Sequence, residues 1–278
     1  MGSLLVTGAG GLLGSELCAR ALHGGWDVEG LILDRRAPDG VRARRLDVRE
    51  AAAIGDLFAS IAPDVVIHTA YRLGGADMRS TNVDGAAVVA AAAREAGARL
   101  VHMSSDVVFS GGLGRPLRED DPLDPLSEYG RSKAEAEAAV AAAHPGALIV
   151  RTSLLYGGRG LGPHELLALA AARGERDVTF FTDELRSPVA VTDLAAALLE
   201  HAELEVGGGP LHVAGADGID RLEFARLIAA AHCLEPAVLR GGRGGPDRPK
   251  DCRLDSSRAA KLLRTRLRGA REVLAACP

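Results

Sequence analysis

A tyrosine and a lysine four positions apart are the residues best suited to chemistry on a carbonyl group. Tyr129 and Lys133 lie at the start of an alanine-rich helix pattern, and residues four apart share one face of a helix. A phenol ionises at about pH 10, and a neighbouring ammonium lowers that pKa. The spacing therefore predicts an acid–base pair. The alternative is a packed tyrosine beside a surface lysine.

A serine at the end of a predicted strand would complete this group. The strand expected over residues 99–104 runs on into Ser105. Its hydroxyl can then face the phenol of Tyr129. The chain has only three tyrosines, which makes a chance arrangement of this kind less common.

A glycine-rich loop near the start of the chain could hold a dinucleotide. The expected strand 3–7 runs into G-A-G-G-L-L-G over residues 8–14, which opens a helix over 12–22. Glycines permit the tight turn, close approach of backbone N–H groups to a pyrophosphate, and close packing of the helix. A plain strand-to-helix turn is the alternative. No Gly-Lys-Ser/Thr follows, which disfavours nucleotide hydrolysis.

The residues at the end of the second expected strand give conflicting indications of whether the cofactor is NAD or NADP. Asp34 follows Gly14 by about 20 residues, the spacing of a carboxylate that binds the adenosine ribose of NAD. Arg35 and Arg36 come directly after it and could pair with the 2′-phosphate of NADP, or be solvated loop charges. We therefore expect NAD or NADP, with the preference open.

The elements that must position these residues alternate between strands and helices. Continuous apolar runs are typical of strands covered on both faces, and we expect them at residues 3–7, 27–33, 44–47, 64–68, 99–104 and 147–152. Helices are expected at residues 12–22, 50–60, 81–96 and 128–143. This alternation predicts an α/β fold with a doubly wound parallel sheet of the Rossmann type.

The pattern changes after about residue 152, where glycine and proline become frequent. We expect residues 1–152 to form mainly a dinucleotide-binding domain. Residues 153–278 would form mainly a smaller substrate-binding lobe, with some segments returning to the first domain. Its expected helices are 165–172, 191–201, 222–232 and a terminal pair after 255, and its strands are 178–181 and 211–214. The basic stretch 258–271 is typical of an exposed amphipathic helix.

Several motifs, in order, resemble those of the extended short-chain dehydrogenase/reductase superfamily, and within it the dTDP-4-dehydrorhamnose reductase group. Residues 104–111 read S-S-D-V-V-F-S-G, where that group has S-T-D-Y-V-F-D-G. The matches continue with E-D-D-P (119–122), P-L (125–126) and Y-G-R-S-K (129–133). Others are N-V-D-G (82–85), R-T-S-L-L-Y-G (151–157), R-P-K (248–250) and L-D (254–255). The similarity spans nearly the whole chain.

The resemblance implies roles for residues at matching positions. Ser105 would hydrogen-bond the substrate carbonyl, and Tyr129 would protonate the resulting alkoxide. Lys133 would hold the cofactor ribose and depress the Tyr129 pKa, while Asn82 would support the active-site helix. The implied cofactor contacts are Gly8, Gly11, Leu12, Leu13, Gly14, Asp34, Arg35, Asp47, Val48, Thr69, Ala70, Tyr71, Asn82, Tyr129 and Lys133.

The substrate pocket departs from the family pattern. The family's tryptophan in R-T-S-W is Leu154, its tyrosine in S-T-D-Y is Val107, and the loop 71–79 is shorter. Ser104 is a further implied substrate contact. Arg186, which precedes a helix, could grip a substrate diphosphate, or be an ordinary surface arginine. We expect no metal site, since Glu119, Asp120 and Asp121 are typical of an exposed turn.

Composition narrows the class of protein further. The net charge of −4 and the 3% aromatic content disfavour a nucleic-acid-binding surface. The four cysteines, Cys18, Cys233, Cys252 and Cys277, have no zinc-like spacing, so we expect reduced thiols in a cytoplasmic protein. No apolar stretch of about 18 residues lacks charge, so no membrane span is expected. A homodimer remains open.

The resemblance implies a reductase that uses NAD(P)H to reduce a nucleotide-linked 4-keto-6-deoxysugar, with Tyr129 as proton donor. A sugar-nucleotide epimerase or dehydratase is an alternative within the same class of fold. A non-catalytic, NAD(P)-binding partner is the alternative from another class, because the regulatory subunit of methionine adenosyltransferase shares the resemblance.

Overall fold

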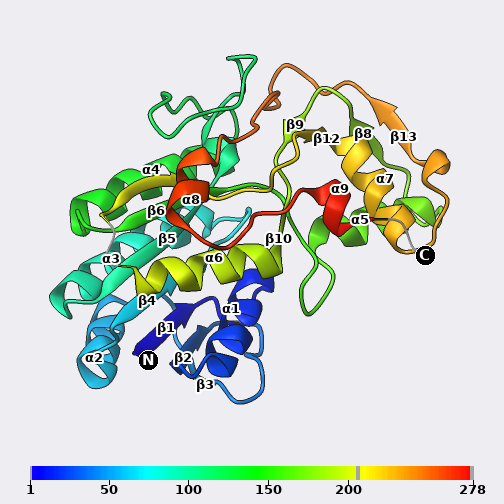
Figure 1. The fold of residues 1–278 in the computed structure, drawn as a ribbon. Coiled ribbons are helices and arrows are strands. Elements are labelled where there is room, and N and C mark those ends of the chain that lie inside the picture. The colour runs from blue at the N-terminus through cyan, green and yellow to red at the C-terminus, as the bar shows by residue number, and fades with distance from the viewer. Residues whose placement is uncertain (1, 205–206, 276–278) are drawn as a thin grey trace.

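A parallel sheet of seven strands organises the protein, whose computed structural model describes residues 2–204 and 207–275. The strands lie in the order β11-β6-β5-β4-β1-β2-β3, and every neighbouring pair is parallel (Figure 1). Their bounds are β1 Ser3–Thr7, β2 Asp27–Ile32, β3 Arg42–Arg45, β4 Val65–His68, β5 Arg99–Ser105, β6 Leu148–Thr152 and β11 Gly209–His212. This doubly wound order confirms the predicted fold class.

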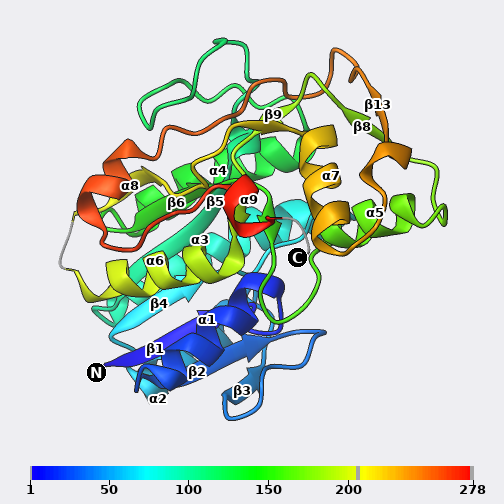
Figure 2. The ribbon, with the colours of Figure 1, turned by 45° about the vertical axis from the view of Figure 1, so that its right-hand side comes forward.

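Alternate residues of the buried strands pack on opposite faces of the sheet. Leu4 and Val6 of β1 face the core formed with α1 (Leu12–His23) and α6 (Val191–Glu203). Leu5 faces the other core, which includes residues of α2 (Ala51–Ile61), α3 (Ala86–Glu95) and α4 (Glu128–Ala143). Both faces of the sheet are therefore covered by helices (Figure 2), as the continuous apolar runs predicted.

The helix expected over residues 81–96 divides into two parts. Ser80–Gly85 forms a π-helix, η1, and α3 begins at Ala86. The helix approaches the loop after β3 closely at Gly85, where an added Cβ would lie 2.7 Å from a Val48 methyl carbon. Short π-helical segments are frequent at functional sites, and this one contains Asn82.

A second, smaller apolar core lies in the second half of the chain, to the right of the sheet in Figure 1. Tyr156, Phe180 and Phe224 are its large buried residues. Its helical elements are α5 Pro163–Ala172, α7 Arg221–Ala231, η3 Pro236–Val238 and α9 Ala270–Val273. Its short strands pair as β7 Leu155–Tyr156 with β10 Val189–Ala190, β9 Leu185–Arg186 with β12 Ile219–Asp220, and β8 Thr179–Phe181 with β13 Arg240–Gly242.

In this half of the chain, two expected elements pack on the main sheet and one expected helix is divided. The strand expected at 211–214 is β11, which pairs with β6 in the main sheet, and α6 packs on that sheet beside α1. Neither belongs to the small core because their apolar residues face the main one. The terminal helix pair expected after residue 255 is present as α8 (Ser257–Leu262) and α9. The expectation of one amphipathic helix over 258–271 was therefore wrong.

The cysteines differ from one another in state. Cys18 and Cys252 are free and buried, and burial raises the pKa of each thiol to about 12. Cys233 is disulfide-bonded, so the expectation of reduced thiols was wrong there. Cys277 lies outside the described residues.

In the described part of the chain, no helix combines the length and the apolar character needed to cross a membrane.

Candidate active site

The glycine loop forms a cradle that side chains would fill. Gly8 has a φ of +71°, and an added Cβ there would lie 2.9 Å from the amide nitrogen of Ala70. A Cβ on Gly14 would lie 2.2 Å from the Gly8 carbonyl oxygen. Gly11 caps the start of α1, next to Leu12 and Leu13. The loop and the helix N-terminus thus leave the backbone open to the approach of a pyrophosphate, and the contacts expected from the sequence stay a prediction.

Acidic and basic groups both surround the predicted ribose site. The carboxylate of Asp34 is exposed and lies 3.6 Å from a guanidinium nitrogen of Arg72. Arg35 and Arg36 are exposed as well. The carboxylate expected to favour NAD and the arginines expected to favour NADP are thus both accessible to a ligand. Sequence reasoning missed Arg72, which belongs to the loop after β4.

The pair Asp47 and Val48 follows β3. The carboxylate of Asp47 accepts hydrogen bonds from the backbone N–H of Arg49 at 3.0 Å and from its guanidinium at 2.7 Å. The hydrogen bonds from Arg49 lower the pKa of Asp47. Val48 is buried against Gly85. The pair therefore joins the end of β3 to the start of α3.

The ends of β1 and β4 are tied together beside the glycine loop. The Thr69 hydroxyl donates to the Thr7 carbonyl oxygen at 2.7 Å, and the Ala70 N–H donates to the Thr7 hydroxyl at 3.3 Å. Tyr71 follows, with its ring half exposed and its centroid 6.0 Å from that of Tyr129. Predicted cofactor and catalytic residues thus meet at this edge of the sheet.

Tyr129 lies in the first turn of α4, which begins next to the end of β5. The Ser127 hydroxyl caps the helix by accepting from the Gly130 N–H at 3.0 Å. An added Cβ on Gly130 would lie 2.3 Å from the Val107 carbonyl oxygen. This close approach brings Tyr129 to the segment that holds Ser105. Burial of the phenol, then Tyr71 and Asp106, raise the Tyr129 pKa well above its usual range.

Lys133 is one turn further along α4 and is buried. Its ammonium donates a hydrogen bond to the Met103 carbonyl oxygen of β5 at 2.6 Å. Burial lowers its pKa to about 8, against an opposing effect of Glu137. The predicted depression of the Tyr129 pKa by Lys133 is not seen, because burial dominates both groups.

The end of β5 carries two serines with different surroundings. The Ser105 hydroxyl donates to Asp106 at 3.3 Å and accepts from the Val107 N–H at 3.4 Å. Ser105 stays partly accessible. Ser104 is buried and donates to Glu137 at 2.5 Å, and Glu137 pairs with Arg151. Ser105 is thus placed to meet a ligand, whereas Ser104 belongs to a buried ion-pair network.

Asn82 links the loop after β4 to α4. Its side-chain carbonyl accepts from the Arg72 N–H at 2.8 Å, and its amide donates to the Arg72 carbonyl at 2.9 Å. The same amide donates to the Ser132 hydroxyl of α4 at 2.9 Å. These bonds join the loop after β4 to α4, and the expected supporting role of Asn82 stays a prediction.

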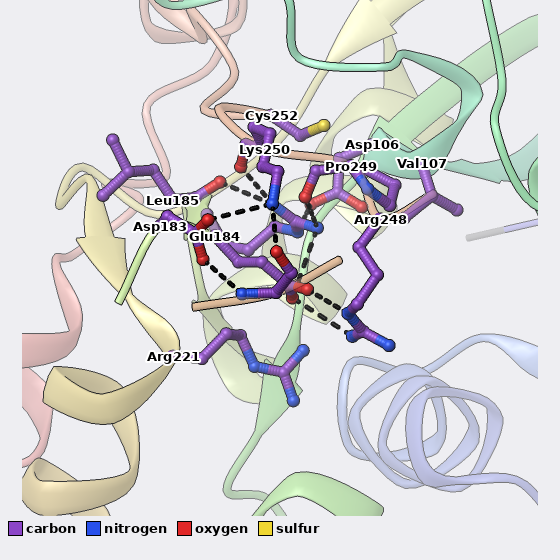
Figure 3. A network of polar contacts seen from close by, with 12 residues as sticks. Asp106, Val107, Asp183, Glu184, Leu185, Arg221, Arg248, Pro249, Lys250 and Cys252 are labelled. Atoms are coloured by element: carbon purple, nitrogen blue, oxygen red, sulfur yellow. Dashed lines mark hydrogen bonds and ion pairs between the residues drawn. The ribbon is translucent and has the colours of Figure 1, made fainter. Parts of the chain in front are cut away.

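Arg186 is buried inside the protein, so its interpretation as a surface arginine was wrong. Its guanidinium donates to the carbonyl oxygens of Leu185 and Lys250, both at 2.8 Å, and of Pro249 at 3.0 Å. It also lies 3.7 Å from the Asp106 carboxylate. Figure 3 shows the surrounding charged cluster, which we define as Asp106, Asp183, Glu184, Arg186, Arg221, Arg248 and Lys250.

The other predicted substrate contacts lie around this site. Val107 lies two residues after Ser105 and is partly buried. Leu154 packs against the small core. Sequence reasoning missed Asp106 and Arg221. Asp106 lies inside the quoted S-S-D motif, whereas no spacing relates Arg221 to the other site residues.

Among the described residues, no group of three or more His, Cys, Asp or Glu side chains is placed to hold a metal ion.

A doubly wound sheet, a glycine loop after β1 and a Tyr/Lys pair on α4 define the extended short-chain dehydrogenase/reductase class. The chain belongs to the family described as RmlD substrate binding domain, whose model matches residues 2–277. The resemblance predicted from the motifs is therefore confirmed.

Individual relatives carry different names. A dTDP-4-dehydrorhamnose reductase of Mycobacterium tuberculosis is 36% identical over 249 residues, covering 85% of this chain and 78% of the relative. Methionine adenosyltransferase 2 subunit beta of Bos taurus is 29% identical over 282 residues, covering 93% and 82%. A crystal structure of dTDP-4-dehydrorhamnose reductase from Bacillus anthracis in complex with NADP has a TM-score of 0.84 at 23% identity, covering 98% of this chain and 96% of that one. This last likeness shows the shared fold.

Proposed function

We propose that the protein is a reductase that uses NADH or NADPH to reduce the 4-keto group of a nucleotide-linked 6-deoxysugar. The observation that carries this proposal is the convergence of Ser105, Tyr129 and the glycine loop at the carboxyl edge of one parallel sheet. Ligands of open α/β sheets bind at this edge. The reductase relative from Mycobacterium tuberculosis supports the same reaction class.

Each residue has a defined task in this proposal. A bound nicotinamide cofactor supplies the hydride, and Gly8, Gly11 and Gly14 leave room for its pyrophosphate. The Ser105 hydroxyl hydrogen-bonds the substrate carbonyl oxygen. Tyr129 gives its proton to the oxygen that becomes the alcohol. The phenol is protonated before the reaction, because an ordinary tyrosine ionises only at about pH 10 and burial raises the pKa of Tyr129 further.

We also propose that the two halves of the chain bind different ligands. Residues 1–152 would mainly bind the dinucleotide, and residues 153–278 mainly the substrate. The small core around Phe224 supports a separate lobe. β11, α6 and α8 would be the segments that return to the first domain.

The direct test is oxidation of NADPH or NADH by the purified protein with dTDP-4-keto-6-deoxysugars. We expect one cofactor oxidised for each keto group reduced. Conversion of a nucleotide sugar without net cofactor oxidation would instead support an epimerase or dehydratase.

A second candidate is a regulatory, non-catalytic binding subunit. The similarity to methionine adenosyltransferase 2 subunit beta favours it. Co-purification with a methionine adenosyltransferase, together with no turnover of any keto-sugar nucleotide, would support this candidate over the reductase.

A further inference from the structure

One guanidinium of the charged cluster has no carboxylate partner. Arg221 is the first residue of α7, and its guanidinium lies 3.3 Å from Nδ1 of the His164 imidazole at the start of α5. In Figure 3 its guanidinium points away from the carboxylates, and no dashed line joins it to the other residues drawn. The other arginines of the cluster contact carboxylates, so Arg221 is the exception among the cluster residues that the structure describes.

The nearby carboxylates are already engaged. Glu184 is fully buried and contacts both Arg186 and Arg248. Asp183 accepts from Lys250 at 2.9 Å. Asp106 lies near Arg186. The cluster as defined therefore holds three carboxylates and four cations. The surplus positive charge falls on Arg221.

Glu184 and Asp106 favour the charged form of Arg221, but among the described residues neither of them forms an ion pair with Arg221. Burial, and then Arg186, lower its pKa to about 10, so it stays protonated at neutral pH. Burial and Arg221 itself lower the pKa of His164 to about 4, so this imidazole is neutral. An unpaired, recessed cation is unfavourable. An anion that reaches the site would remove that penalty.

The site is reachable and lies near the proposed reaction centre. Arg221 remains partly accessible to solvent. Asp106 interacts electrostatically with Arg221 and also with Tyr129, which places the three groups in one neighbourhood. The positive N-terminal ends of α5 and α7 meet at His164 and Arg221, which adds to the attraction for an anion.

We propose that Arg221 binds a phosphate group of the nucleoside diphosphate part of the substrate. The planar donors of a guanidinium match the oxygens of a phosphate. Arg186, the residue expected for this task, is occupied by three backbone carbonyls and holds the cluster together instead. The inference rests on the proposed function for the identity of the substrate.

The test compares ligands with and without phosphate. Calorimetric titration measures binding of dTDP and of thymidine to the wild-type protein, Arg221→Gln and a matched control, Arg226→Gln. Arg226 is an exposed residue of the same helix. We expect R221Q to weaken dTDP binding about tenfold or more. Thymidine binding by R221Q and dTDP binding by R226Q should remain unchanged.

Binding of NADPH checks that each variant is folded. If R221Q also loses NADPH binding, the variant Arg221→Lys replaces it in the test, because lysine keeps the positive charge but lacks the planar donors. The proposal then expects normal NADPH binding and several-fold weaker dTDP binding. Wild-type affinity for dTDP in R221Q or R221K, equal losses in R226Q, or no dTDP binding by the wild-type protein would overturn it.

The result separates this inference from the proposed function. If dTDP binding depends on Arg221 but no keto-sugar is reduced, the anion site stands and the reductase proposal fails. If keto-sugars are reduced with unchanged KM by R221Q, the reductase stands and the anion site fails.

Discussion

The glycine loop and the charged cluster would bind phosphate groups in opposite ways. The loop of residues 8–14 presents backbone N–H groups and a helix N-terminus, and its glycines keep side chains out. The cluster presents guanidinium groups, and its surplus charge lies on Arg221. The first site is set by consecutive residues, whereas the second is assembled from the residue after β5, residues 183–186 in and before β9, α7, and the loop after β13. Backbone geometry defines one site and long-range charge balance defines the other.

The largest effect is expected from breaking the charge balance of the cluster. Glu184→Gln leaves Arg186 and Arg248 without their buried carboxylate, and the free energy of unfolding should fall by about 3 kcal/mol. Urea denaturation measures this. The exposed Asp120→Asn serves as control and should change little. A loss below about 0.5 kcal/mol in E184Q would show that the cluster does not depend on this charge.

A smaller but more local effect is expected in the glycine loop. Gly14→Ala places a Cβ 2.2 Å from the Gly8 carbonyl oxygen, and overpacking of this kind costs about 1–3 kcal/mol. NADPH binding should be lost as the cradle shifts. Gly55→Ala is the matched control, because Gly55 also lies within a helix and has open space around it. Equal NADPH affinity in G14A and G55A would contradict the cradle.

The buried Lys133 predicts a pH dependence of stability. Burial lowers its pKa from the usual 10.5 to about 8 in the folded protein, so the unfolded chain binds more protons between these two pH values. Stability therefore rises with pH across that window, and below about pH 8 the contribution is constant. The melting temperature of the wild type should therefore rise relative to that of Lys133→Met between pH 8 and pH 10. A difference independent of pH would contradict the burial of a charged Lys133.

The smallest effect concerns the choice of cofactor. Asp34→Asn removes the exposed carboxylate that would accept the ribose hydroxyl of NADH, and this affinity should fall about threefold to tenfold. NADPH binding should be unchanged or tighter, because Arg35 and Arg72 remain. Asp39→Asn, which changes another exposed carboxylate of the same segment, should alter neither. Equal loss for both cofactors would exclude Asp34 as a selective group.

The same contrast explains what the sequence could predict. Apolar runs and the glycine loop are local signals, and they predicted the first six strands of the sheet and α4. The small strands β9 and β12 were missed because each has two residues and depends on its distant partner. The burial of Arg186 could not be predicted either, since its hydrogen-bond acceptors Pro249 and Lys250 are far along the chain. Asn82 was found by motif, but its π-helix depends on the packing of Gly85 against Val48.

The central claim is that Tyr129 donates the proton in a reduction driven by a nicotinamide cofactor. The most direct measurement is steady-state turnover of a dTDP-4-keto-6-deoxysugar by wild type and Tyr129→Phe, with NADPH affinity measured in parallel. The account predicts that kcat falls about 10²- to 10⁴-fold in Y129F while the Kd for NADPH stays the same. Turnover by Y129F at the wild-type rate would contradict it.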